Sequence, residues 1–83
     1  MNILYFAWVR QKVGKSEETI ELSPELRTVR DLATFLVSRG GGYAEAFADM
    51  TRLRVAVNQV HAGLDATVGA GDEVAFFPPV TGG

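Results

Sequence analysis

Cysteine is absent from this sequence of 83 residues, and histidine occurs once, at His61. Without cysteine the chain can form no disulfide, no thiolate zinc site and no redox thiol, and one histidine does not hold a metal ion by itself. Positive charge is also scarce, because 8 Lys and Arg stand against 10 Asp and Glu, for a net charge of −2. A nucleic-acid-binding domain normally carries a basic stripe, so this balance argues against one.

Long apolar runs are missing as well. No run approaches the roughly 20 residues of a membrane-spanning helix, and no signal peptide opens the chain. Hydrophobic residues nevertheless make up 47% of the sequence and charged residues 22%, which is typical of a folded domain rather than a disordered chain. We therefore expect one small domain over residues 1–83, in the cytoplasm, that works with a larger partner.

The chain opens with a run that predicts a strand. Residues 2–9 are rich in aromatic and branched side chains and have no helix cap before them. Strand alternation places Ile3, Tyr5, Ala7 and Val9 on one face, and Leu4, Phe6 and Trp8 on the other. Because both faces are apolar, we expect the protein's own helix to cover one and a partner to contact the other.

Shorter patterns predict the remaining strands. A polar segment, 10–18, with a turn at Gly14, leads to alternation at 19–22 that predicts a hairpin with the first strand. Residues 53–57 and 73–77 also alternate, with a turn at Asn58–Gln59 leading to a short segment around Val60. Pro78 and Pro79 end the last strand, because proline cannot donate to a ladder.

One helix has clear signals at both ends. Thr28 is placed to cap it, with Asp31 three residues later as in a capping box. Helical spacing then puts one apolar stripe toward the core, formed by Val29, Leu32, Ala33, Leu36 and Val37. The glycine run 40–42 ends this helix, and 43–50 predicts a second, short one. The order of elements predicts an α+β fold of the ubiquitin-like β-grasp type, with the last strand beside the first, although other small α+β rolls share this order.

Few side chains suggest chemistry, and the informative element is the end of the chain. The scattered carboxylates indicate solvated surface, and the segment Gly69–Asp72 precedes a strand rather than a helix, so it indicates a turn and not a phosphate loop. Residues 80–83 carry no charged side chain and end in two glycines after the stiff Pro78–Pro79 pair. The six residues 78–83 can extend about 20 Å.

A diglycine end can enter a narrow channel, because it has no Cβ atoms. Its reactive group is then the α-carboxylate of Gly83. Adenylation by ATP makes that carboxylate an electrophile, and a sulfur nucleophile can displace AMP to leave a thiocarboxylate. A frayed chain end without function is the alternative interpretation.

Three segments carry a resemblance to one family, and this resemblance covers the whole chain. The block Gly71-Asp-Glu-Val-Ala-Phe-Phe-Pro-Pro-Val-Thr-Gly-Gly83, the opening Ile3–Arg10 and the stretch Ala56–Asn58 resemble the small subunit of molybdopterin synthase. The resemblance implies a β-grasp fold, adenylation of Gly83 by an E1-like enzyme with ATP and Mg²⁺, and conversion to a thiocarboxylate. It also implies a large synthase subunit as partner, in a heterotetramer. That subunit holds the active site, where sulfur passes to cyclic pyranopterin monophosphate and forms the molybdopterin dithiolene.

The same resemblance suggests which residues act, with no stably bound cofactor and no metal. It implies that the tail residues Pro79, Val80, Thr81 and Gly82 enter the large subunit ahead of Gly83. Partner contact is implied for Phe6, Trp8, Arg10, His61 and Phe77, with His61 standing where the family often has an aliphatic residue. Two alternatives stay open: a sulfur carrier for thiamine or a tungsten cofactor, and a ubiquitin-like modifier or plain binding module.

Overall fold

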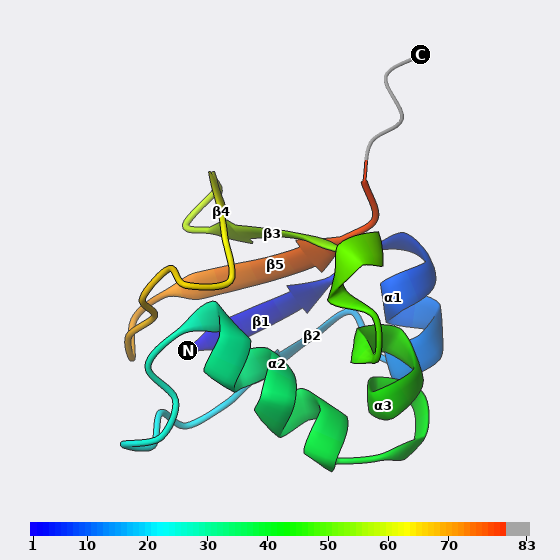
Figure 1. Ribbon diagram of the computed structural model, residues 1–83, viewed down its shortest axis with the longest axis horizontal. Coiled ribbons are helices and arrows are strands. Elements are labelled where there is room, and N and C mark those ends of the chain that lie inside the picture. Colours follow the sequence, from blue (N-terminus) through cyan, green and yellow to red (C-terminus); the bar gives the residue numbers. More distant parts are fainter. Residues whose placement is uncertain (80–83) are drawn as a thin grey trace.

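The computed structural model describes residues 1–79, which form a five-stranded mixed sheet with helices against one face (Figure 1). The strands are β1 (Asn2–Tyr5), β2 (Glu17–Thr19), β3 (Arg54–Val57), β4 (Val60–Ala62) and β5 (Glu73–Phe77). Their order in the sheet is β2-β1-β5-β3-β4. β5 pairs with β1 in parallel, and the other neighbours are antiparallel. The predicted α+β fold of the β-grasp type, with the last strand beside the first, is confirmed.

The predicted first strand is wrong in its second half. β1 ends at Tyr5, and helix α1 (Ala7–Val13) begins two residues later. The Phe6 amide still donates to the Phe76 carbonyl oxygen, at 3.1 Å, before Ala7 turns away with a φ of 53°. Two prolines, Pro78 and Pro79, follow β5. Because proline has no N–H to donate, the parallel ladder between β1 and β5 cannot continue. The alternation at 7–9 therefore belongs to a helix, of which Val9 is the buried residue.

The first hairpin forms as predicted, but with its second strand shifted. β2 occupies Glu17–Thr19 rather than 19–22. Its register pairs Glu18 with Ile3, which directs the Glu18 side chain to the helix-covered face of the sheet. Gly14 ends α1 with a φ of 90°, in the left-handed conformation that the turn requires.

Helix α2 (Val29–Ser38) begins as the sequence predicts. Thr28 accepts from the Asp31 amide at 3.2 Å, and Asp31 accepts from the Thr28 amide at 3.1 Å, which completes the capping box. Four residues of the expected stripe are buried, whereas Val37 is 36% exposed and lies outside it.

The glycine run does more than end α2. Gly40 caps helix α3 (Gly41–Phe47), so Gly41 and Gly42 are helical and the predicted start at residue 43 is too late. A one-turn 3-10 helix, η1 (Met50–Arg52), then leads into β3. In α3, Gly42 lies so close to α1 that a Cβ atom would overlap the carbonyl oxygen of Lys12.

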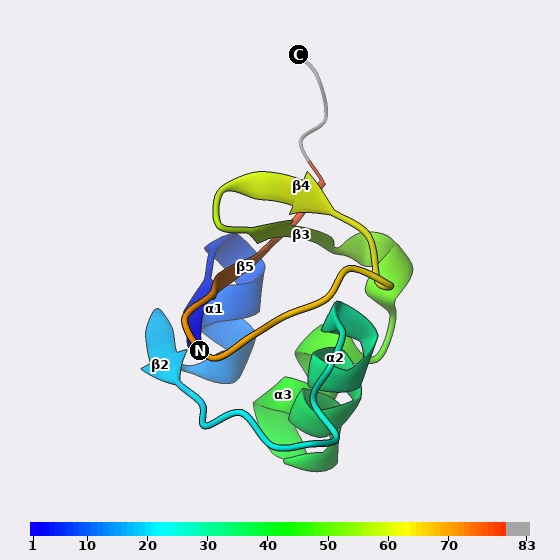
Figure 2. The ribbon, with the colours of Figure 1, turned by 90° about the vertical axis from the view of Figure 1, so that its left-hand side faces the viewer.

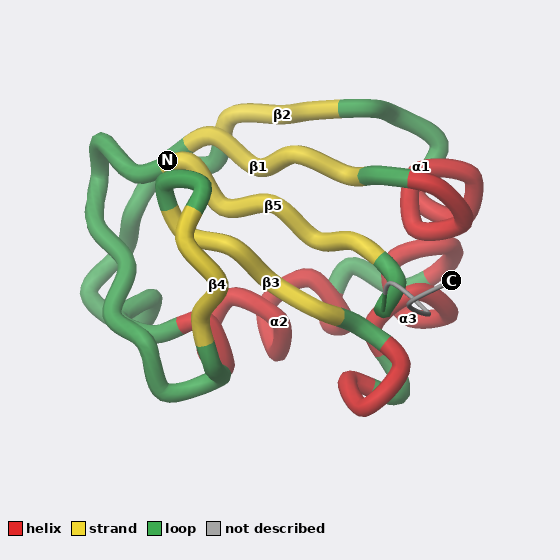
Figure 3. Tube along the Cα trace, turned by 90° about the horizontal axis from the view of Figure 1, so that it is seen from above, coloured by secondary structure: helices red, strands yellow, loops and turns green. Residues whose placement is uncertain are grey.

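The core lies between the sheet and helices α2 and α3. Phe47 of α3 packs edge-on against Phe76 at 4.8 Å and against Tyr5 at 6.2 Å between ring centroids. Figure 2 shows α2 and α3 on this side, and Figure 3 views the strands from the opposite side, with α1 at one end of the sheet. Within residues 1–79 no helix lies over that second face, which we call the open face.

Candidate functional site

The strand register defines the side chains of the open face. Leu4 of β1 pairs with Ala75 of β5, Ala75 pairs with Ala56 of β3, and Ala56 pairs with His61 of β4. One row of small or apolar groups therefore crosses the middle of the sheet and ends at His61. The next residue of β5 on this face, Phe77, pairs with Arg54. Ala75 and Phe77 are half-buried, whereas their neighbours Val74 and Phe76 are fully buried on the helix side.

Three of the predicted contact residues lie together on or beside this face. The rings of His61 and Phe77 meet edge to face, with centroids 5.6 Å apart and planes at 87°. Phe6 follows β1 directly and is 47% exposed, and it is the aromatic residue among the exposed large hydrophobic side chains of the described chain. The hydrogen bond that its amide donates to the Phe76 carbonyl oxygen keeps Phe6 beside the end of β5, where the chain runs into Pro78.

Trp8 and Arg10 are not where the predicted strand would place them. Both belong to α1, so Trp8 does not share a strand face with Leu4 and Phe6. The Trp8 ring is half-buried, and the guanidinium of Arg52 stands over it, 5.3 Å from its centroid. Arg10 is exposed one turn into the helix. The sequence offered no signal for the Arg52–Trp8 contact, because it joins η1 to α1 across the end of the sheet.

The tail begins at this same end of the sheet. Pro78 is half-buried and Pro79 is exposed, directly after the central strand β5. The predicted site residues Val80, Thr81, Gly82 and Gly83 lie outside the described residues. Phe77 thus precedes the base of the tail directly, Phe6 lies beside the end of the same strand, and Trp8 lies on α1 under Arg52.

The described residues provide little for a bound cofactor at this end. Among residues 1–79, no cluster of three His, Asp or Glu side chains has metal-binding geometry. Two shallow cavities, of about 370 and 570 Å³, flank α2, and no predicted site residue lines either of them. Within the same part of the chain no helix is long and apolar enough to cross a membrane.

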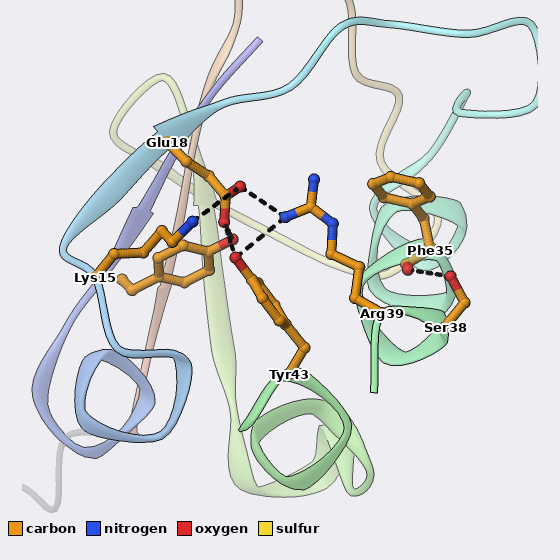
Figure 4. A network of polar contacts seen from close by, with 7 residues as sticks. Lys15, Glu18, Phe35, Ser38, Arg39 and Tyr43 are labelled. Carbon is orange, nitrogen blue, oxygen red and sulfur yellow. Dashed lines mark hydrogen bonds and ion pairs between the residues drawn. The ribbon is translucent and has the colours of Figure 1, made fainter. Parts of the chain in front are cut away.

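A polar network lies on the opposite, helix-covered side (Figure 4). The Glu18 carboxylate accepts from the Tyr5 hydroxyl at 2.8 Å, from the Arg39 guanidinium at 2.6 Å and from the Tyr43 hydroxyl. Lys15 adds an ion pair at 3.8 Å. The network joins the first hairpin to α2 and α3, and sequence analysis missed it because its members are brought together only by the fold.

Burial and hydrogen bonding set the charge of this network. Desolvation by itself would raise the pKa of Glu18, but the hydrogen bonds from Tyr43, Arg39 and Tyr5 outweigh it and hold that pKa below its usual value. Burial, together with the bond to Glu18, raises the pKa of the Tyr5 hydroxyl. Glu18 is therefore ionised and Tyr5 neutral at pH 7.

We expect the substitution Glu18→Gln to lower the free energy of unfolding at pH 7 by about 1–3 kcal/mol, because the neutral amide cannot form an ion pair with Arg39. A carboxyl group with a lowered pKa in the folded state stabilises the protein above its unfolded pKa, and this contribution is lost as pH falls through the folded value. Urea unfolding should therefore show a smaller difference between wild type and variant at pH 3 than at pH 7.

The matched control is Glu45→Gln, whose partner Lys12 lies at 3.4 Å in an exposed pair. It should change stability by no more than about 0.5 kcal/mol at either pH. An equal loss for Glu18→Gln at both pH values would contradict an ionised, network-bound Glu18.

The similarity of this chain to known proteins spans nearly its whole length, in sequence and in structure. The model of the ThiS family matches residues 3–83. The molybdopterin synthase sulfur carrier subunit of Escherichia coli is 40% identical over 83 residues, covering 100% of this chain and 99% of that protein. A solved structure of the putative molybdopterin converting factor, subunit 1, from Pyrococcus furiosus has a TM-score of 0.76 and 35% identity, covering 95% of each chain. The crystal structure of SAMP1 from Haloferax volcanii has a TM-score of 0.74 and 28% identity, covering 100% of this chain and 98% of that one.

Proposed function

The chain belongs to the ThiS family, and on this premise we propose that it is the sulfur carrier subunit of a molybdopterin synthase, working in the cytoplasm. The observation that carries the proposal is the end of the sequence, where Gly82–Gly83 follows the central strand by way of Pro78–Pro79. The full-length similarity to curated sulfur carrier subunits supports the specific pathway. In this proposal residues 1–83 form one carrier domain, and residues 78–83 are its projecting tail.

The proposed chemistry takes place at the carboxylate of Gly83. An E1-like enzyme transfers the AMP part of ATP to that carboxylate, and pyrophosphate leaves. A sulfur nucleophile then attacks the acyl carbon, the bond to AMP breaks, and the chain end becomes a thiocarboxylate. Two carriers each deliver one sulfur atom to cyclic pyranopterin monophosphate, which forms the dithiolene of molybdopterin. The carrier binds neither ATP nor the pterin by itself in this scheme.

The fold suits this role because it provides a firm base for the tail. β5 is hydrogen-bonded on both sides, by β1 and β3, and its inward side chains Val74 and Phe76 are fully buried. The tail therefore leaves from the central strand of the sheet. A partner that binds the open face can direct residues 79–83 into a channel without first ordering the rest of the carrier.

We propose the large synthase subunit as that partner, in a heterotetramer. The surface that contacts the large subunit would contain Phe6, Phe77 and His61. Phe6 is an exposed aromatic residue, and the ring of His61 adds polar atoms next to the ring of Phe77. Arg10 would lie at the edge of the same surface, and Trp8 would support it from beneath Arg52. The E1-like enzyme would use an overlapping surface, since it must receive the same tail.

Mass spectrometry tests the proposal directly. After incubation with an E1-like enzyme, ATP and a sulfide source, we expect replacement of one oxygen atom by sulfur, mapped to Gly83 by C-terminal fragments. Mapping is needed because oxidation of a methionine gives almost the same mass change, and the chain has two methionines. An unmodified tail with a competent activating enzyme would contradict the carrier function.

A second candidate is a protein modifier, favoured by the similarity to SAMP1 of Haloferax volcanii, a small archaeal modifier protein. A modifier would also be adenylated at Gly83 but would end as an amide on lysines of other proteins. Lysine adducts carrying the C-terminal residues of this chain would favour the modifier. Stable co-purification with a synthase large subunit would favour the carrier.

A further inference from the structure

The positive charges of the described chain divide into two groups. Lys12, Lys15, Arg30 and Arg39 each form an ion pair with a carboxylate. Within residues 1–79, Arg10, Arg27, Arg52 and Arg54 have no carboxylate within ion-pair distance. Arg27 precedes α2 and donates to the carbonyl oxygen of Pro24. The other three belong to the elements around the end of β5.

Arg54 lies beside the last residue of β5, and Arg52 lies two residues before Arg54, at the end of η1. Arg54 pairs with Phe77 in the sheet register, so its side chain starts on the open face beside that ring. Its guanidinium donates to the carbonyl oxygen of Leu53 at 2.9 Å, which satisfies a donor but does not neutralise the charge. Arg52 ends η1 and stands over Trp8 of α1. Figure 1 shows η1, α1 and the end of β5 at the same end of the molecule.

One acidic residue, Asp49, lies near this pair, and its charge attracts that of Arg52 without forming an ion pair. It offsets only part of the positive charge of Arg52 and Arg54. Asp49 caps η1, and its carboxylate accepts from the amide of Thr51 at 3.0 Å and from the Thr51 hydroxyl. Both arginines are exposed. The protein as a whole carries a net charge of −2, so this positive end contrasts with the rest of the chain.

The length of the tail indicates which part of a partner Arg52 and Arg54 would contact. Residues 78–83 can span about 20 Å, so a carboxylate at Gly83 that is inserted into a partner lies far from the base of the tail. Arg52 and Arg54 therefore cannot act on the nucleotide or pterin when the tail is extended. They would face the rim of the channel that receives the tail.

Resting on the proposed carrier function, we propose that Arg52 and Arg54 dock against carboxylates at the rim of the tail channel of the large synthase subunit. The surface of the large subunit that contacts Arg52 and Arg54 would thus be acidic and would surround a narrow opening, complementary to the positive charge at the base of the tail. Exposed charges of this kind act mainly on the association rate, because they steer the encounter before the apolar face is buried.

The test is stopped-flow association of the full-length carrier with its purified large subunit, at several salt concentrations. The double variant Arg52→Gln/Arg54→Gln should associate about 3- to 10-fold more slowly at low salt, with a shallower salt dependence and a similar dissociation rate. Arg52→Lys/Arg54→Lys keeps the charge and should associate at nearly the wild-type rate. The matched control, Arg27→Gln/Arg30→Gln, removes the same charge from the amino end of α2 and should stay within about 2-fold.

The possible outcomes separate this proposal from the carrier function. Equal slowing by both Gln pairs would show an effect of net charge alone and overturn the docking proposal. Unchanged association of Arg52→Gln/Arg54→Gln, or slowing only of adenylation by the E1-like enzyme, would also overturn it while leaving the carrier function intact. A wild-type chain that does not bind the large subunit would overturn both.

Discussion

Deletion of Gly83 is expected to abolish sulfur transfer while leaving the fold unchanged. The reacting group in the proposed mechanism is the α-carboxylate of Gly83, and the deletion leaves this group on Gly82, about 3.5 Å short of its place in the adenylation site. Adding a single residue after Gly83 should have the same effect, because it moves the carboxylate out of the adenylation site. The measurement is synthase activity of the assembled carrier and large subunit, after activation with ATP and a sulfide source.

Two controls make this result specific to the chain end. One residue added before Met1 should leave activity unchanged, and the variants should unfold at the wild-type urea concentration, because the described residues 1–79 already form a continuous core. Binding to the large subunit should persist in both tail variants if the open face supplies most of the contact. Full activity of the chain lacking Gly83 would rule out the carrier mechanism.

The second large effect is expected from Gly42→Ala. In an ordinary helix this change would stabilise by about 0.5–1 kcal/mol, because alanine is the better helix former. Here the added Cβ atom would overlap the backbone carbonyl of Lys12, and a backbone atom cannot rotate away as a side chain can. We expect a net loss of about 2 kcal/mol or more and a melting temperature lower by roughly 10 °C.

The control for this prediction is Gly63→Ala. A Cβ atom at Gly63 would meet nothing within 4 Å, and the residue is exposed. Its stability should remain within about 0.5 kcal/mol of wild type by thermal unfolding. A Gly42→Ala protein as stable as the control would show that α1 and α3 can separate without cost.

The contact between α1 and α3 also bears on the proposed site. α1 starts beside the end of β5 and carries Trp8, over which Arg52 stands. Displacement of α1 by a side chain at position 42 would therefore disturb the tail base as well as the core. Gly42→Ala is expected to weaken binding to the large subunit in proportion to this displacement, whereas Gly63→Ala is not.

Local signals were sufficient for several elements. The capping box at Thr28 and Asp31, the turn at Asn58–Gln59 and the alternation of β5 each depend on residues within a few positions of one another. The position of β5 beside β1 followed from the order of elements and the rules of chain connection. The chemistry proposed for the tail also needs only the covalent sequence, since its reactive group is the end of the backbone.

Other features depended on residues that are distant in the sequence. The strand beginning at Asn2 stops at Tyr5 because its partner strand runs into Pro78, more than seventy positions later. The run through Trp8 fits either a strand or a helix locally, so only this long-range pairing decides between them. Glu18, Arg39 and Tyr43 likewise form a network only because the sheet and two helices bring them together.

The sequence by itself therefore predicted an α+β fold of the β-grasp type and the main helix, and it provides the diglycine end on which the proposed chemistry rests. Tertiary structure alone decided which aromatic residues reach the open face, since Phe6 is exposed while Trp8 lies beneath Arg52. It also placed Arg54 beside the last residue of β5 and Arg52 over Trp8. The physical reason is that periodicity and capping are local properties of the backbone, whereas strand pairing and helix contacts join segments that no local pattern relates.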